Sequence, residues 1–120
     1  MKDSAVSFLK MCASGHAREA FEKYVGNDFK HHKPYFKGDA VSLRDAMQEN
    51  AEQYPGKIFE VQRALEEGDL VAVHSRVQFD EKAQVIAVVH IFRFDAGKVV
   101  ELWDVGQLVP EHSPNEYGVF

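Results

Sequence analysis

Residues 88–105 read VVHIFRFDAGKVVELWDV, two alternating apolar runs that flank the turn residues 95–97. The pattern predicts two antiparallel strands joined by a three-residue loop, because the glycine of the loop can adopt a left-handed conformation. Counting back by twos from this loop pairs His90 with Leu102. Side chains alternate between the faces of a strand, so His90 and Asp104 become diagonal neighbours on one face, roughly 7–8 Å apart at the backbone.

The hairpin before it is expected to supply a second histidine. If Leu70–Phe79 and Gln84–Asp95 fold about Lys82, His74 lies directly opposite His90. The turn has no decisive glycine, and a slip of one residue would send His74 to the other face.

These groups suggest acid/base chemistry in an apolar pocket. An aspartate becomes a stronger base there, because burial disfavours its charged form. Asp104 could then remove a proton next to a carbonyl group while His90, assisted by His74, hydrogen-bonds the enolate oxygen. Arg76, on the face of His74, could hold an anionic substrate group or pair with Asp104. The alternative is a buried ion pair that only satisfies polar groups.

A metal site and a cofactor site are the competing interpretations of the same residues. Two histidines and a carboxylate can form a facial triad, but here they would come from three strands without close His-x-Asp spacing. No glycine-rich phosphate loop follows a predicted strand. We therefore expect neither a metal nor a cofactor.

The chain changes from a helical period to a period of two near its middle. Ser4–Val25 predicts two helices broken near Ser14-Gly15, 27–40 reads as a loop, and a third helix begins near Ser42 and is stopped by Pro55-Gly56. The predicted strands are Lys57–Glu66, Leu70–Phe79, Gln84–Asp95 and Lys98–Gln107. This order predicts a single α+β domain over 1–120, with the helices covering one face of an antiparallel sheet.

The other face of the predicted sheet is strongly apolar. Its expected members are Val71, Val73, Val77, Val85, Ala87, Val89, Ile91, Val99, Trp103 and Val105. A soluble monomer rarely exposes such a surface, so we expect a homodimer packed through this sheet face. The alternative is that the C-terminal tail 108–120 covers it.

Composition limits the partners and the location. The 120 residues carry a formal net charge of −5, which disfavours nucleic acid as a ligand. The single cysteine, Cys12, cannot form an intrachain disulfide and reads as a small buried hydrophobe. With no long apolar stretch, a cytoplasmic protein without a membrane span is expected.

The run 88–105 resembles the C-terminal half of SnoaL-like proteins, the polyketide cyclase-like branch of the NTF2-like superfamily. The likeness extends to 29–34 (FKHHKP) and 113–116 (SPNE). It implies a cone of three helices on a strongly curved antiparallel sheet that encloses a cavity, usually in a dimer. It also implies that Asp104 is the acid/base of a cofactor-independent aldol cyclisation, with His90 assisting.

The resemblance adds further candidates for contact with a small-molecule substrate. His32 matches a loop histidine at the cavity mouth, where it could line the cavity or anchor the loop through a hydrogen bond. Lys33 departs from the asparagine usual at the next position. Apart from the resemblance, the aromatic residues Tyr54 and Phe92 are expected to line the core or the cavity, and with Trp103 they complete the set. Because the family includes cyclases, dehydratases, isomerases, epoxide hydrolases and binding modules, it does not select the reaction. We expect acid/base catalysis on a small carbonyl-containing or cyclic metabolite, with non-catalytic small-molecule binding as the alternative.

Overall fold

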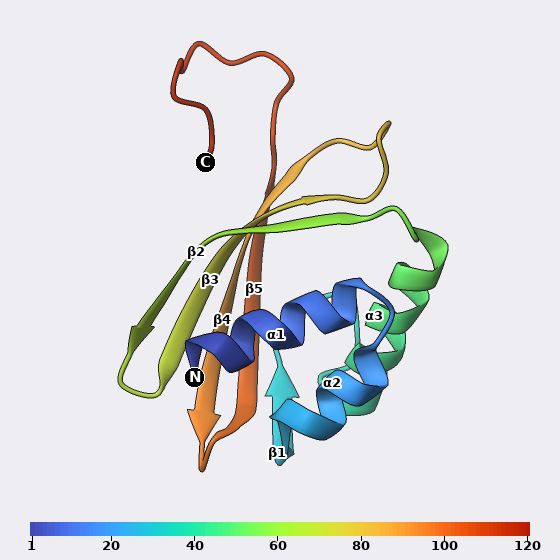
Figure 1. The fold of residues 1–120 in the computed structure, drawn as a ribbon, viewed down its shortest axis with the longest axis vertical. Helices are drawn as coiled ribbons and strands as arrows, with labels where there is room; N and C mark the ends of the chain where they lie inside the picture. Colours follow the sequence, from blue (N-terminus) through green and yellow to red (C-terminus); the bar gives the residue numbers. More distant parts are fainter.

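The computed structural model describes residues 1–120 and has three helices packed on a curved, open, mostly antiparallel sheet of five strands (Figure 1). The elements are α1 (Lys2–Ala13), α2 (Ala17–Tyr24), β1 (Val25–His31), α3 (Ala40–Gln53), β2 (Ile58–Glu67), β3 (Leu70–Gln78), β4 (Ile86–Asp95) and β5 (Lys98–Leu108). The predicted α+β class is confirmed. None of the three helices has the length and apolar character needed to cross a membrane.

The third helix begins earlier than the sequence pattern predicted. Asp39 is its N-cap, and the Asp39 carboxylate accepts hydrogen bonds from the backbone N–H of Ser42 (3.0 Å) and from the Ser42 hydroxyl (2.7 Å). A capping aspartate satisfies backbone donors that the first helical turn leaves free. The start predicted at Ser42 was therefore wrong, because Ser42 belongs to the first turn.

The sheet has the order β1-β5-β4-β3-β2. Strands β2 to β5 form the predicted antiparallel meander, whereas β1 pairs with β5 in parallel. The sequence of β1, VGNDFKH, lies within a stretch interpreted mostly as a loop. An edge strand with few apolar residues shows little of the alternation that identifies a half-buried strand, so its pattern was missed.

The β4–β5 turn is shorter than predicted. Asp95 pairs with Lys98, which leaves only Ala96 and Gly97 in the loop, and these have φ angles of 50° and 79°. Positive φ at both central positions is the hairpin geometry whose twist matches that of the flanking strands. The predicted three-residue loop was wrong.

A β-bulge in β5 follows this turn. Phe94 pairs with Val99 but Arg93 pairs with Glu101, so Val100 is an extra residue. The combined effect of turn and bulge is that His90 lies directly opposite Asp104. The predicted diagonal relationship was therefore wrong, while the prediction that both side chains share a face is confirmed.

The β3–β4 register differs from the prediction by one residue. His90 pairs with Val73, and His74 pairs with Val89. A one-residue slip exchanges the two faces of a strand, so His74 and Arg76 lie on the face opposite His90. The predicted alignment of His74 with His90 was wrong.

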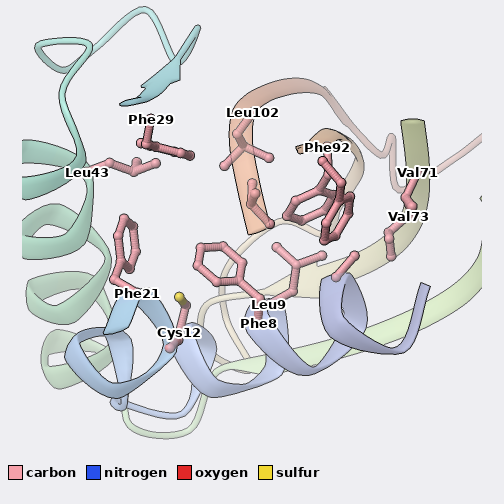
Figure 2. Packing of buried hydrophobic residues seen from close by; sticks show 14 of the residues in the cluster. Phe8, Leu9, Cys12, Phe21, Phe29, Leu43, Val71, Val73, Phe92 and Leu102 are labelled. Atoms are coloured by element: carbon pink, nitrogen blue, oxygen red, sulfur yellow. The ribbon is translucent and has the colours of Figure 1, made fainter. Parts of the chain in front are cut away.

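The face of the sheet that carries His90 packs against the helices and is called the inner face. Figure 2 shows aromatic and aliphatic side chains from helices and strands meeting there. The rings of Phe8 in α1 and Phe92 in β4 meet edge to face, with centroids 5.9 Å apart, and neither side chain is exposed. Burial of each ring stabilises the fold by about 1.5–3 kcal/mol.

The opposite, outer face is more polar than predicted. Alternation from the observed registers places four of its predicted members, Val71, Val73, Val77 and Val99, on the inner face, where they are buried. The homodimer through this face stays a prediction. Near the β2 edge of the outer face the C-terminal residue contacts the sheet: the Phe120 ring stacks on His74 at 5.7 Å, and the Phe120 carbonyl accepts a hydrogen bond from Arg63 (3.1 Å).

Candidate active site

A cavity of about 640 Å³ lies between the inner face, α1, α3 and the loop after β1. Hydrophobic side chains form most of its wall, 14 of 22 lining residues. The basic side chains of the wall are Lys33, Lys57 and His90, and its one carboxylate is that of Asp104. An apolar cavity with a few converging polar groups is the usual form of a small-molecule site.

His90 and Asp104 enter the cavity from neighbouring strands. The His90 Nε2 atom lies 3.8 Å from Asp104 Oδ2, and His90 is buried with 7% of its surface exposed. Burial lowers the pKa of His90 to about 4; Lys33 and Lys57 also lower it, and Asp104 opposes them. The imidazole is therefore neutral at neutral pH, and its Nδ1 atom has no hydrogen-bond partner.

Lys33 is a site residue whose role the sequence did not reveal. Its ammonium donates a hydrogen bond of 3.0 Å to Asp104 Oδ2. The backbone N–H of Lys33 donates to His31 Nδ1 (3.1 Å), so the His31 Nε2–H must donate to the carbonyl of Lys37 (2.7 Å). The available signal was the departure from the family asparagine at position 33.

Lys57 is the second missed residue. It lies just before β2 and lines the cavity, with Nζ 5.2 Å from the centre of the Phe79 ring. Burial, and then the charge of Lys33, lowers the pKa of Lys57. The missed signal was its position two residues before Phe59, which gives both residues the same parity in the strand pattern.

Cys12 of α1 also lines the cavity and is buried, as predicted for a small hydrophobe. Burial raises the pKa of its thiol to about 12, against a smaller opposing effect of the Lys57 charge. A thiol that stays protonated is a poor nucleophile. Figure 2 shows the sulfur among the packed side chains.

His32 does not line the cavity. Its ring stacks on Trp103 at 5.2 Å with an angle of 7° between the planes, and its Nε2 atom lies 2.7 Å from Glu101 Oε2. Alternation at the end of β1 turns His31 inward and His32 outward. Of the two roles considered for His32, the structure shows the hydrogen bond from the loop and not the cavity lining, and Trp103 does not line the cavity either.

His74 and Arg76 also contact partners outside the cavity. Arg63 contacts the ring of His74 at Nδ1, and Arg76 donates a hydrogen bond of 2.9 Å to Glu60. The facial triad considered from the sequence is not assembled, because His74 projects away from His90 and Asp104. No group of three or more histidine, cysteine or acidic residues in the structure is arranged to hold a metal ion.

The two remaining aromatic candidates lie next to the cavity wall rather than in it. Phe92 is fully buried in the core, and its ring centre is 6.4 Å from that of His90. Tyr54 stacks on Phe79 at 5.1 Å, and Phe79 forms part of the wall. Of the eight residues predicted to form the site, the structure brings only His90 and Asp104 together in the cavity.

Residues 6–102 match the SnoaL-like domain family. No curated protein matches the sequence. Among solved structures, IdmH, a "putative polyketide cyclase" from Streptomyces antibioticus, has 17% identity and a TM-score of 0.72, over 88% of this chain and 90% of that one.

Two further solved structures are similar. A "putative polyketide cyclase" from Bacillus cereus ATCC 10987 has 20% identity and a TM-score of 0.74, over 87% of this chain and 72% of that one. AclR, a "putative hydroxylase" from Streptomyces galilaeus, has 20% identity and a TM-score of 0.67, over 90% of this chain and 81% of that one. At these identities the likeness shows a common fold and does not show a common reaction.

Proposed function

The chain belongs to the SnoaL-like domain family, and from this premise we propose that it catalyses proton transfer at a carbon atom of a small carbonyl-containing or cyclic metabolite. The supporting observation is the convergence of the Asp104 carboxylate and a buried, neutral His90 at 3.8 Å in a largely apolar cavity. A carboxylate there can act as a general base, and a neutral imidazole can donate one hydrogen bond without carrying charge.

In the proposed reaction, Asp104 takes a proton from the carbon next to a carbonyl group, and the electrons of the broken C–H bond form an enolate. His90 donates a hydrogen bond to the enolate oxygen, where negative charge develops. If the enolate carbon then attacks a second carbonyl of the same molecule, a ring closes and the new alkoxide takes the proton back from Asp104. If the substrate instead carries a C=C bond conjugated with the enolate, Asp104 returns the proton to the far carbon of that system and the double bond moves. Lys33 holds the carboxylate in place through its 3.0 Å contact with Oδ2.

Binding without catalysis is a second candidate function. The Lys33 ammonium already occupies one oxygen of Asp104, which is also what a purely structural ion pair would do. In that case His90 and the ion pair would only orient a ligand. The two candidates differ in whether a bound ketone exchanges its carbon-bound protons.

Deuterium exchange tests the proposal. The protein is incubated in deuterated buffer with 1-tetralone and with cyclohexanone, and loss of the α-proton signal is followed by NMR. We expect the protein to accelerate exchange and Asp104→Asn to reduce the acceleration by about 100-fold or more, since general-base catalysis contributes about that much.

Glu101→Gln provides the matched control, because Glu101 lies on the same strand but contacts Arg93 and His32 on the outer face. It should leave the exchange rate unchanged. An Asp104→Asn variant that keeps the full rate, or a wild-type protein that binds both ketones without exchange, would exclude the catalytic proposal.

A further inference from the structure

The charges that line the cavity do not cancel. Lys33 is paired with Asp104 at 3.0 Å. His90 is neutral near pH 7, and the buried Cys12 stays protonated. Lys57 therefore contributes a positive charge for which the cavity wall has no acidic partner.

The Lys57 side chain lines the cavity and is half-buried. It makes no ion pair with a carboxylate, and its nearest aromatic neighbour is the Phe79 ring at 5.2 Å. Its charge acts on His90 in β4 and on Cys12 in α1, which lie on different walls of the cavity. A half-buried ammonium that has lost water and gained no counterion is a favourable partner for an anion.

We propose that Lys57 binds an anionic group of the substrate, so that the cavity selects organic carboxylates with an apolar ring or chain. Lys33 is not available for this role, because Asp104 already engages it. The wall beside Lys57, formed by Phe59 and Phe79, offers an apolar surface for the rest of the molecule. The inference refines the proposed function by adding a carboxylate to the carbonyl substrate, but binding alone is enough to test it.

The test compares 1-naphthoate with 1-naphthalenemethanol, which share a ring system and differ in charge. Affinities come from ¹H–¹⁵N NMR titrations, and shifts of the amides of Lys57, Phe79 and His90 report binding in the cavity. We expect the wild-type protein to prefer the carboxylate by about tenfold, the size of one partly desolvated ion pair. The preference should fall below about twofold in Lys57→Met and persist in Lys57→Arg.

Lys82→Met is the control, since Lys82 is an exposed lysine of the β3–β4 loop and does not line the cavity. It should keep the wild-type preference. Equal wild-type affinity for the two probes, a preference that survives Lys57→Met, or naphthoate shifts confined to residues outside the cavity would each overturn the proposal.

The Asp104→Asn variant separates this inference from the catalytic proposal. It should still prefer naphthoate, because Lys57 is unchanged and a nearby negative charge has been removed. Failure of Asp104 as a base would therefore leave the anion site standing. If wild-type protein shows no preference for naphthoate, the anion site is excluded, but the proposal of proton transfer by Asp104 is unaffected.

Discussion

The Asp104 carboxylate accepts a hydrogen bond of 3.0 Å from the Lys33 ammonium across 71 positions of sequence. The contact joins the loop after β1 to strand β5. Both side chains keep some contact with water, so the pair contributes no more than about 1 kcal/mol to stability. Its main consequence is the orientation of the carboxylate beside His90.

Titration of the His90 ring by NMR checks the electrostatics of the site. Lys33→Met should raise the pKa of His90 above its value of about 4, because a positive charge that disfavours the imidazolium is lost. Asp104→Asn should lower it, because the favourable negative charge is lost. Exposed His112 serves as an internal reference. A His90 ring that titrates near 6.5 in all three proteins would contradict its buried position.

The same histidine should make stability depend on pH. Its pKa is about 4 in the folded protein and 6.5 when the ring is fully solvated, so between these values the unfolded chain binds a proton that the folded protein does not. The free energy of unfolding is therefore not reduced by this residue above about pH 6.5, and it falls as the pH drops from there toward about 4. Urea unfolding at about pH 7.5 and about pH 5 should show a loss of roughly 2 kcal/mol that is absent in His90→Gln. Equal losses in both proteins would refute this assignment.

The single tryptophan reports on the position of His32. His32→Ala should expose one face of Trp103 and shift its fluorescence emission to longer wavelength, because the imidazole stacks on it at 5.2 Å. Naphthoate affinity should stay within about twofold of the wild-type value, since His32 lies outside the cavity. A large loss of affinity with an unchanged emission spectrum would show that His32 faces the ligand.

The β4–β5 turn offers a stabilising substitution. Ala96 has a φ of 50°, a left-handed conformation that costs an alanine roughly 1 kcal/mol and that asparagine tolerates better. Ala96→Asn should therefore raise the melting temperature, by an amount that corresponds to about 0.5–1 kcal/mol. Ala83→Asn, in the preceding loop, is the control. A lower melting temperature for Ala96→Asn would contradict the turn geometry.

The parts of the fold that follow from side-chain alternation could be predicted from sequence. The meander β2–β5 and the shared face of His90 and Asp104 are examples. The pairing register of the strands was harder to predict, because it depends on single extra residues in turns and bulges. The loop between Gln78 and Ile86 shifted His74 to the outer face, and the shorter β4–β5 turn together with the unpaired Val100 changed the partner of His90.

The two cavity lysines were missed for a different reason. Lys33 lies in a loop, where no period tells which way a side chain points, and Lys57 lies just before β2, where its parity with Phe59 was the one available signal. Their positions depend on tertiary contacts, such as the hydrogen bond from the Lys33 ammonium to Asp104, 71 residues away in the sequence. His31 was not predicted either, because its neighbour His32 matches the family loop better.

The extra residue in β5 determines which chemistry reaches the interior. With the observed two-residue turn and no bulge, Trp103 would stand opposite His90, and Asp104 would project from the outer face. The identity of the group beside the imidazole is therefore encoded by chain length between positions 95 and 101 as much as by residue type. Deletion of a single codon there would replace the carboxylate beside His90 with the Trp103 indole, without substituting any residue of the site.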